Sequence, residues 1–305
     1  MTRVACVQAP AILGDPAANL ETVKEYLQAL AEDGVDIVVF PECFLTGYVV
    51  STEEEARRIA LTATEAASEY EDVEEDAFYM SEEIAQLDAL CEELDIVCVV
   101  GYAAETALGE LVNECVLIEP GQFPAVYRKT HLPCLGFDNF AMTGDDLPVF
   151  ETRYGRIGMA ICYDLRIPET LRVLALKGAD LVILPTNWPE GADFSADSVA
   201  PVRAMENKVF LATCNRCDEE GGFRFIGKSG IFGLNGEPLA KAGSEPEVIV
   251  ANLNLPAARD KRNVNPVTGY ATEVFAARQP DLYDVIVSGQ ELPTVPPELE
   301  DEDEA

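Results

Sequence analysis

The chain has 305 residues, 48% of them hydrophobic, so it is long enough and apolar enough to form a sizeable packed core. Its 55 acidic and 21 basic residues give a formal net charge of −34, which excludes a protein that binds along the phosphates of a nucleic acid. No run of about 18 apolar residues occurs, so we expect no transmembrane helix and no membrane partner.

Buried strands and amphipathic helices alternate through the first part of the sequence. Residues 1–8 enter a strand pattern directly, without the basic region and long apolar stretch of a signal peptide, so we expect a cytoplasmic protein. Apolar residues at helical spacing predict a helix over 19–30, closed by Gly34. Residues 52–86 are strongly acidic and alanine-rich, and they predict exposed helices. Strands are expected at 4–7, 36–40, 95–101, 112–118 and 123–127, the last two as a hairpin.

The same alternation continues in the second part. Helices are predicted over 168–177, where Pro168 takes the first position, and over 197–207. Strands are expected at 155–161, 180–184, 209–214, 230–232 and 248–253. Because no linker interrupts this order, we predict one α/β domain over residues 1–285. An acidic tail rich in proline and glutamate, predicted to be disordered, follows over 286–305.

The acidic excess and the cysteines indicate the environment of the protein. An acidic surface stays soluble in concentrated salt, which screens its self-repulsion, so we hypothesise a salt-loving host. Nine cysteines are scattered along the chain, several of them in apolar runs, and this predicts reduced thiols rather than disulfides. Cys214 and Cys217 have the C-x-x-C spacing of redox and metal sites. Without a second cysteine pair or a nearby histidine we expect no metal there.

The single histidine, His131, restricts the chemistry that the chain can perform. A Ser–His–Asp or Cys–His hydrolase needs an imidazole, and a histidine zinc site usually needs two or three. We expect His131 to be a structural hydrogen-bonding residue. Cys162 nevertheless follows an apolar strand in a setting typical of a nucleophile. Its base would then have to be a carboxylate, and its cation a lysine or an arginine.

Glu42, Lys129 and Cys162 each follow a predicted strand. Open α/β sheets bind their ligands at the carboxyl ends of strands, so residues distant in sequence can converge there. The three residue types suffice for acyl transfer without imidazole. A lysine lowers the pKa of a thiol and later faces the oxyanion, and a carboxylate carries the proton. The backbone N–H of Tyr163 is the natural second oxyanion donor.

Several segments of the sequence resemble the signatures of the nitrilase, or carbon–nitrogen hydrolase, superfamily. The similarity covers roughly residues 2–255. Three signature segments occur in the family's order and spacing: Phe40-Pro41-Glu42 with Thr46-Gly47-Tyr48, the run from Tyr127 to Pro133, and the run from Cys162 to Glu169. The runs from Leu184 to Pro189 and from Arg203 to Asn207 also resemble family segments.

The resemblance implies a four-layer α-β-β-α sandwich, a dimer of such sandwiches, and a Glu–Lys–Cys triad that uses no cofactor. Carried over by position, Cys162 is the nucleophile, Glu42 the general base and acid, and Lys129 the stabiliser of the tetrahedral intermediate. Many family members have a second glutamate shortly after the lysine. Here the segment lacks one, and Asp138, one methylene shorter, is the nearest acidic residue.

Residues around this triad are expected to shape the pocket. Asn187 and Trp188, in a strand-end loop, are candidates for contacting the substrate, and Asn215 is a weaker one. An ion pair between Asp164 and Arg166 is expected to shape the turn after Cys162.

The leading interpretation is an enzyme that hydrolyses a small linear amide or carbamoyl compound through a cysteine thioester. Two alternatives stay open at this point: a nitrilase acting on a C≡N bond, and a non-catalytic thiol protein with the same fold. The expected partners are a small-molecule substrate and further copies of the chain, as a homodimer or higher homo-oligomer.

Overall fold

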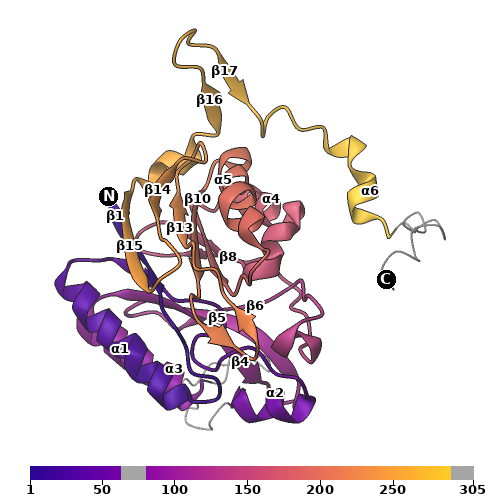
Figure 1. The fold of residues 1–305 in the computed structure, drawn as a ribbon. Helices are drawn as coiled ribbons and strands as arrows, with labels where there is room; N and C mark the ends of the chain where they lie inside the picture. Colours follow the sequence, from indigo (N-terminus) through magenta and orange to yellow (C-terminus); the bar gives the residue numbers. More distant parts are fainter. Residues whose placement is uncertain (63–79, 290–305) are drawn as a thin grey trace. The chain divides into compact units, whose positions relative to one another are not determined.

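The structure, a computed structural model, describes residues 1–62 and 80–289 (Figure 1). It divides the chain into two compact units, Met1–Asp260 and Lys261–Ala305. Part of the predicted acidic helical region, residues 63–79, lies outside the described residues, as do residues 290–305 of the predicted tail. The predicted domain boundary at residue 285 therefore stays a prediction.

The first sheet of Met1–Asp260 mixes parallel and antiparallel strands. Its strand order is β15-β1-β2-β4-β5-β6, and β3 pairs with β4. The strands β1, β2 and β4 are mutually parallel, whereas β5 runs against β4 and β6 runs against β5. Their bounds are β15 (Glu247–Leu253), β1 (Thr2–Gln8), β2 (Ile37–Val39), β3 (Leu61–Thr62), β4 (Val97–Glu105), β5 (Leu111–Ile118) and β6 (Ala125–Arg128).

The second sheet has the strand order β14-β13-β10-β9-β8-β7, with β8, β9 and β10 parallel. Its bounds are β14 (Pro238–Lys241), β13 (Gly230–Phe232), β10 (Phe210–Asn215), β9 (Leu181–Thr186), β8 (Arg156–Met159) and β7 (Val149–Glu151). The sequence patterns do not predict β7 and β14, the two edge strands of this sheet. Both carry more exposed residues than the central strands, so they lack the continuous apolar run of a buried strand.

Apolar side chains join the two sheets face to face, because alternate residues of each strand point to opposite faces. The inner core contains Val4, Val39 and Val99 from the first sheet and Met159, Ile183 and Ala212 from the second. The outer face of the first sheet is covered by α1 (Pro16–Glu32) and α3 (Glu82–Leu94), which lie side by side in Figure 1. The short helix α2 (Glu53–Ile59) follows β2 and precedes β3 in the chain.

The second sheet is covered by α4 (Pro168–Leu176) and α5 (Ala200–Asn207), with a π-helical turn over Ser195–Val199 just before α5. Gly158 of β8 lets Leu174 of α4 approach closely, since a β-carbon at Gly158 would lie only 3.3 Å from the Leu174 side chain. The layers are therefore α-β-β-α, and the predicted fold class is confirmed.

Local signals explain where the first helix begins and ends. Pro16 takes the first helical position, and the Asp15 carboxylate accepts a hydrogen bond from the Ala18 N–H, which caps the helix. Gly34, with a φ of 71°, turns the chain after the helix, as predicted.

The unit Lys261–Ala305 contains a hairpin of β16 (Arg262–Val264) and β17 (Ala271–Glu273) and the helix α6 (Asp284–Val287). In Met1–Asp260, a further small hairpin pairs β11 (Glu219–Glu220) with β12 (Phe223–Arg224).

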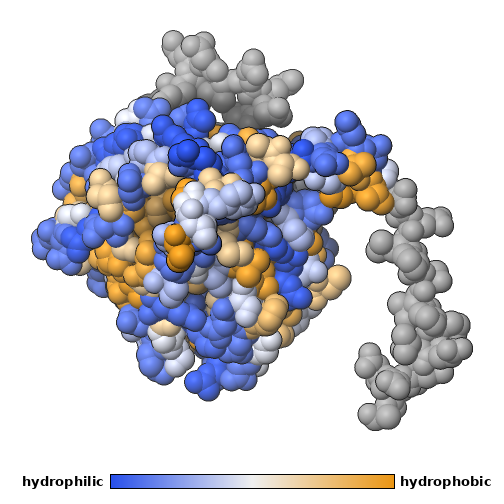
Figure 2. Space-filling model, turned by 90° about the horizontal axis from the view of Figure 1, so that it is seen from above, coloured by the Kyte–Doolittle hydropathy of each residue, from blue (hydrophilic) through white to orange (hydrophobic). Residues whose placement is uncertain are grey.

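Hydrophilic residues are spread over the face drawn in Figure 2, with smaller hydrophobic groups between them. Within the described residues, the helices are all too short or too polar to cross a bilayer.

Candidate active site

Glu42 and Lys129 meet at one edge of the first sheet. Glu42 follows β2 and Lys129 follows β6, and these two strands run in the same direction, because two antiparallel steps separate β6 from β4. Their carboxyl ends therefore lie at the same edge. The Lys129 Nζ atom is 2.7 Å from Glu42 Oε1, and both side chains are fully buried.

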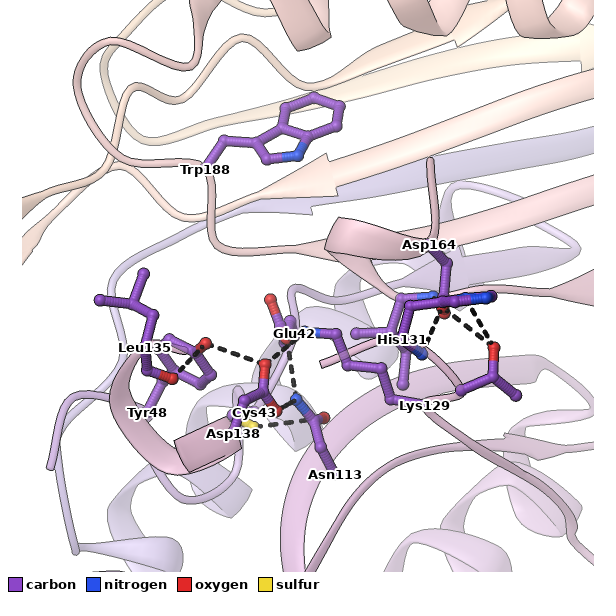
Figure 3. A network of polar contacts seen from close by, with 12 residues as sticks. Glu42, Cys43, Tyr48, Asn113, Lys129, His131, Leu135, Asp138, Asp164 and Trp188 are labelled. Carbon is purple, nitrogen blue, oxygen red and sulfur yellow. Dashed lines mark hydrogen bonds and ion pairs between the residues drawn. The ribbon is translucent and has the colours of Figure 1, made fainter. Parts of the chain in front are cut away.

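Asp138 supplies a second carboxylate to the same lysine. It lies in a short 3-10 helix, Gly136–Asn139, and its Oδ2 atom is 2.6 Å from Lys129 Nζ (Figure 3). Burial alone would lower the pKa of Lys129, but the charges of Asp138 and Glu42 outweigh it and hold that pKa well above its usual range. Lys129 is therefore a permanent cation between two carboxylates.

Burial has the opposite effect on Glu42. It raises the pKa of this carboxyl, and the nearby charge of Asp138 raises it further, while Lys129 and a hydrogen bond from Asn113 lower it in part. The Glu42 Oε1 atom accepts both of these hydrogen bonds. Glu42 Oε2 is buried and has no hydrogen-bond partner among the described residues. One carboxylate oxygen is thus held in place and the other is left free.

Asn113 is a site residue that the sequence analysis misses. Its Nδ2 atom donates to Glu42 Oε1 and to Asp138 Oδ1, both at 2.8 Å. Asn113 is the third residue of β5, and because β5 is antiparallel to β4, its beginning lies at the edge where β4 and β6 end. The signal in the sequence is an asparagine inside the largely apolar run of residues 111–118, and the structure buries this side chain fully.

Tyr48 holds Asp138 from the other side. Its hydroxyl oxygen is 2.9 Å from Asp138 Oδ2 and 2.9 Å from the Leu135 carbonyl oxygen (Figure 3). The backbone N–H groups of Tyr48 and Val49 donate to the Glu220 carboxylate, which pairs with the fully buried Arg216 at 2.9 Å. Arg216, between the two cysteines of the C-x-x-C segment, thus anchors the loop that carries Tyr48.

Cys162 lies at a sharp turn between β8 and a 3-10 helix, Cys162–Arg166. Its φ is 45°, in the left-handed region that non-glycine residues rarely adopt, and such strain is typical of functional positions. The next residue, Tyr163, is in the first turn of this helix, where backbone N–H groups have no intrahelical acceptor. The turn therefore presents the thiol together with a backbone donor.

The charges of Glu42 and Lys129 shift the pKa of the Cys162 thiol in opposite directions. Burial and the Glu42 charge raise its pKa, whereas Lys129 and hydrogen bonds from the Thr186 side chain and the Asn187 backbone lower it. The net pKa lies well above the usual range of a thiol. Lys129 thus lowers the pKa of this thiol, as expected, but burial outweighs its effect.

Asp164 ties the Cys162 turn to the segment that follows Lys129. Its carboxylate accepts hydrogen bonds from the Ile161 N–H at 2.8 Å, the Tyr127 hydroxyl at 2.7 Å and the Thr130 hydroxyl at 3.1 Å. It also lies 2.8 Å from His131 Nδ1. The structural role predicted for His131 is thus confirmed. The predicted ion pair with Arg166 is wrong, because the carboxylate points to these groups instead.

The structure assigns different surroundings to the remaining candidates. Both polar atoms of the Asn187 carboxamide are buried and have no hydrogen-bond partner among the described residues. Trp188 is buried and lies outside the hydrogen-bonded network in Figure 3. The Asn215 carboxamide is buried and forms hydrogen bonds with the backbone groups of Trp188 and Gly227. Its contact with a ligand stays a prediction.

Comparisons with known proteins agree with this geometry. A family model described as carbon-nitrogen hydrolase matches residues 3–263. The nitrilase of Pyrococcus abyssi is 33% identical over 286 residues, covering 93% of this chain and 99% of its own length. The omega-amidase NIT2 of Homo sapiens is 28% identical, covering 88% of this chain and 91% of its own.

A solved structure extends the similarity to three dimensions. A variant of the amidase from Nesterenkonia sp. AN1, which carries the product of Michael addition of acrylamide at the active-site cysteine, aligns with a TM-score of 0.72. It is 25% identical, and the match covers 86% of this chain and 96% of that one. The chain belongs to the carbon–nitrogen hydrolase family of the nitrilase superfamily.

Proposed function

We propose that the protein hydrolyses the carbon–nitrogen bond of a small linear amide through a thioester on Cys162. The observation that carries this proposal is the pattern of used and unused groups around Lys129. An ammonium group has three N–H donors, and two of those of Lys129 face Glu42 and Asp138. The third is available to an oxyanion, beside the unpartnered Oε2 of Glu42.

In the first half of the reaction, Cys162 Sγ forms a bond to the carbonyl carbon of the amide while its proton passes to Glu42. The electron pair of the C=O bond moves to the oxygen, which Lys129 and the Tyr163 N–H stabilise. The C–N bond then breaks, the electron pair re-forms the carbonyl, and the leaving nitrogen takes the proton from Glu42. Ammonia or an amine leaves, and a thioester remains.

In the second half, a water molecule gives a proton to Glu42 as its oxygen attacks the thioester carbon. The C–S bond breaks, the thiol regains its proton from Glu42, and the carboxylic acid leaves. The raised pKa of the Cys162 thiol favours a neutral thiol in the resting enzyme. Proton transfer to Glu42 therefore accompanies sulfur attack rather than preceding it.

Asp138, Asn187 and Trp188 complete the proposed site. Asp138 keeps Lys129 charged and oriented, in the position of the second glutamate of other family members. The unpartnered carboxamide of Asn187 is buried next to the residue that hydrogen-bonds the Cys162 thiol, so it is suited to a polar group of the substrate. Trp188 is proposed as a wall of the acyl pocket.

The test is ammonia release from short amides, ω-amides, carbamoyl amines and nitriles, measured in molar KCl. Wild type is expected to release ammonia from at least one amide class. Cys162→Ala and Glu42→Gln should lose that activity and keep the fold. Cys134→Ala, which removes an exposed thiol, is the matched control and should retain activity. Turnover by Cys162→Ala would contradict the proposal.

A second candidate function is hydrolysis of a nitrile. It is favoured by the relative from Pyrococcus abyssi that is named a nitrilase. The same thiol can attack a C≡N carbon, and the same lysine can face the developing negative charge on nitrogen. Ammonia release from nitriles but not from amides would decide for this candidate, and no release from any compound would support a non-catalytic thiol protein.

We also propose that the chain works as a homodimer or higher homo-oligomer in a salt-rich cytoplasm. The proposal of an oligomer comes from the family resemblance, and that of a salt-rich environment from the net charge of −34. Light scattering after size-exclusion chromatography in molar KCl should give a mass of at least twice the monomer mass of 33.1 kDa.

A further inference from the structure

We infer that Asn113 is a positioning residue that fixes which oxygen of Glu42 acts as the base. The inference rests on the proposed role of Glu42 and deepens it. In the network of Figure 3, the Asn113 amide nitrogen donates to the two carboxylates on either side of Lys129, and it acts through them.

The geometry of the amide is suited to this task. A carboxamide nitrogen has two N–H donors, and those of Asn113 serve two different acceptors, Glu42 Oε1 and Asp138 Oδ1, each at 2.8 Å. The amide oxygen faces the other way and accepts a contact from Cys43 Sγ at 3.6 Å. An amide flipped by half a turn would direct its oxygen at two carboxylates, so this orientation is the electrostatically favourable one.

The Glu42 carboxylate would otherwise be free to rotate about its last bond. With Lys129 as its single partner, either oxygen could face the ammonium group. Asn113 and Lys129 both donate to Oε1, so rotation of the carboxylate breaks a hydrogen bond. In a fully buried site the loss of a hydrogen bond costs considerable free energy. Oε2 is thereby left as the oxygen without a partner, ready for the thiol proton.

Asn113 also holds the lysine through its backbone. The Asn113 carbonyl oxygen accepts a hydrogen bond from the Lys129 N–H at 2.8 Å. A side-chain substitution at position 113 leaves this bond in place. The effect of removing the amide can therefore be separated from displacement of the lysine backbone.

The experiment measures kcat, KM and the pH profile of kcat/KM for ammonia release from propionamide. Asn113→Ser is expected to lower kcat about 10- to 100-fold with little change in KM, because the base is misoriented and binding is not affected. Loss of the hydrogen bond to ionised Glu42 also raises the pKa of Glu42, so the acid limb should move to higher pH. A purely structural role would not move that limb.

Two further variants keep the test decisive. Asn113→Asp preserves the side-chain shape but removes both donors, so it should show the same loss even if Asn113→Ser fails to fold. Tyr48→Phe removes a contact to Asp138 and leaves both hydrogen bonds of Glu42 intact, so its acid limb should stay at the wild-type pH. Wild-type kcat and an unshifted limb in Asn113→Asp would overturn the inference.

The outcome is separable from that of the proposed function. If Cys162→Ala or Glu42→Gln keeps its activity, the proposed function fails and the role of Asn113 fails with it. If both are inactive while the Asn113 variants behave as wild type, the proposed function stands and the positioning role alone is wrong.

Discussion

The ammonium group of Lys129 lies 2.6 Å from the carboxylate of Asp138, and neither side chain is exposed to solvent. Asp138 reaches the lysine although its side chain is one methylene shorter than that of a glutamate. The 3-10 helix Gly136–Asn139 carries it, and the Tyr48 hydroxyl and Asn113 hold its two oxygens. Lys129 therefore has two buried anions around it. Removing the charge of this lysine should lower the free energy of unfolding.

Replacing Lys129 with methionine should destabilise the protein strongly at neutral pH. The variant keeps a long side chain but leaves Glu42 and Asp138 buried without a cation, which costs about 3–5 kcal/mol for a broken buried pair. The loss should shrink in mildly acidic buffer, because burial raises the pKa of Glu42 and this carboxylate can then bind a proton. Urea unfolding at both pH values checks this, with Lys24→Met as the control, since its pair with Glu21 is exposed and worth about 0–1 kcal/mol.

Replacing Asp164 with alanine should weaken both the fold and the activity. The Ile161 N–H and the Tyr127 and Thr130 hydroxyls all lose their shared acceptor, and each buried orphan costs about 1–3 kcal/mol. Tyr127→Phe removes one of these contacts and should cost correspondingly less. Denaturant midpoints of the two variants measure the difference. Equal stability of Asp164→Ala and wild type would show that this network does not hold the two loops together.

The pH profile should follow the raised pKa of Glu42. The proposed base works when it is ionised, so activity is present above the folded-state pKa of Glu42 and is lost as pH falls through it. Burial raises that pKa, so the acid limb of kcat/KM should lie above the usual glutamate value of about 4.3. An acid limb at or below that value would assign the titration to another group.

Stability should increase with salt concentration. The net charge of −34 makes the folded chain repel itself, and added salt shortens the range of this repulsion to about 3 Å at 1 M. Thermal unfolding midpoints measured in dilute buffer and in molar KCl at one pH should therefore differ, with the higher midpoint in salt. The same midpoint in both would remove the support for a salt-loving host.

The sequence predicts the central strands and the positions of Glu42, Lys129 and Cys162 because each residue follows an apolar run. A continuous apolar run is a strong local signal, and the residue after it lies at a sheet edge. The edge strands β7 and β14 give no such signal, because their side chains are partly exposed.

The partners of the site residues depend on strand order, which local patterns do not contain. Asn113 reaches Glu42 because β5 is antiparallel to β4. Asp164, which follows β8 of the second sheet, pairs with Tyr127 and His131 in and after β6 of the first sheet, and not with Arg166. The sequence predicts that a lysine lowers the pKa of Cys162, but the burial that outweighs this effect is a property of the packed sheets.

Cys162 is proposed to carry the acyl group of the substrate, and trapping that group on the protein tests this role. Wild type is mixed with propionamide, quenched with acid and digested, and the peptide containing Cys162 is weighed by mass spectrometry. This peptide is expected to gain a propionyl group. Hydroxylamine added before the quench should remove that group as propionohydroxamate. Ammonia release by Cys162→Ala, or a propionyl group found on another residue, would contradict this role.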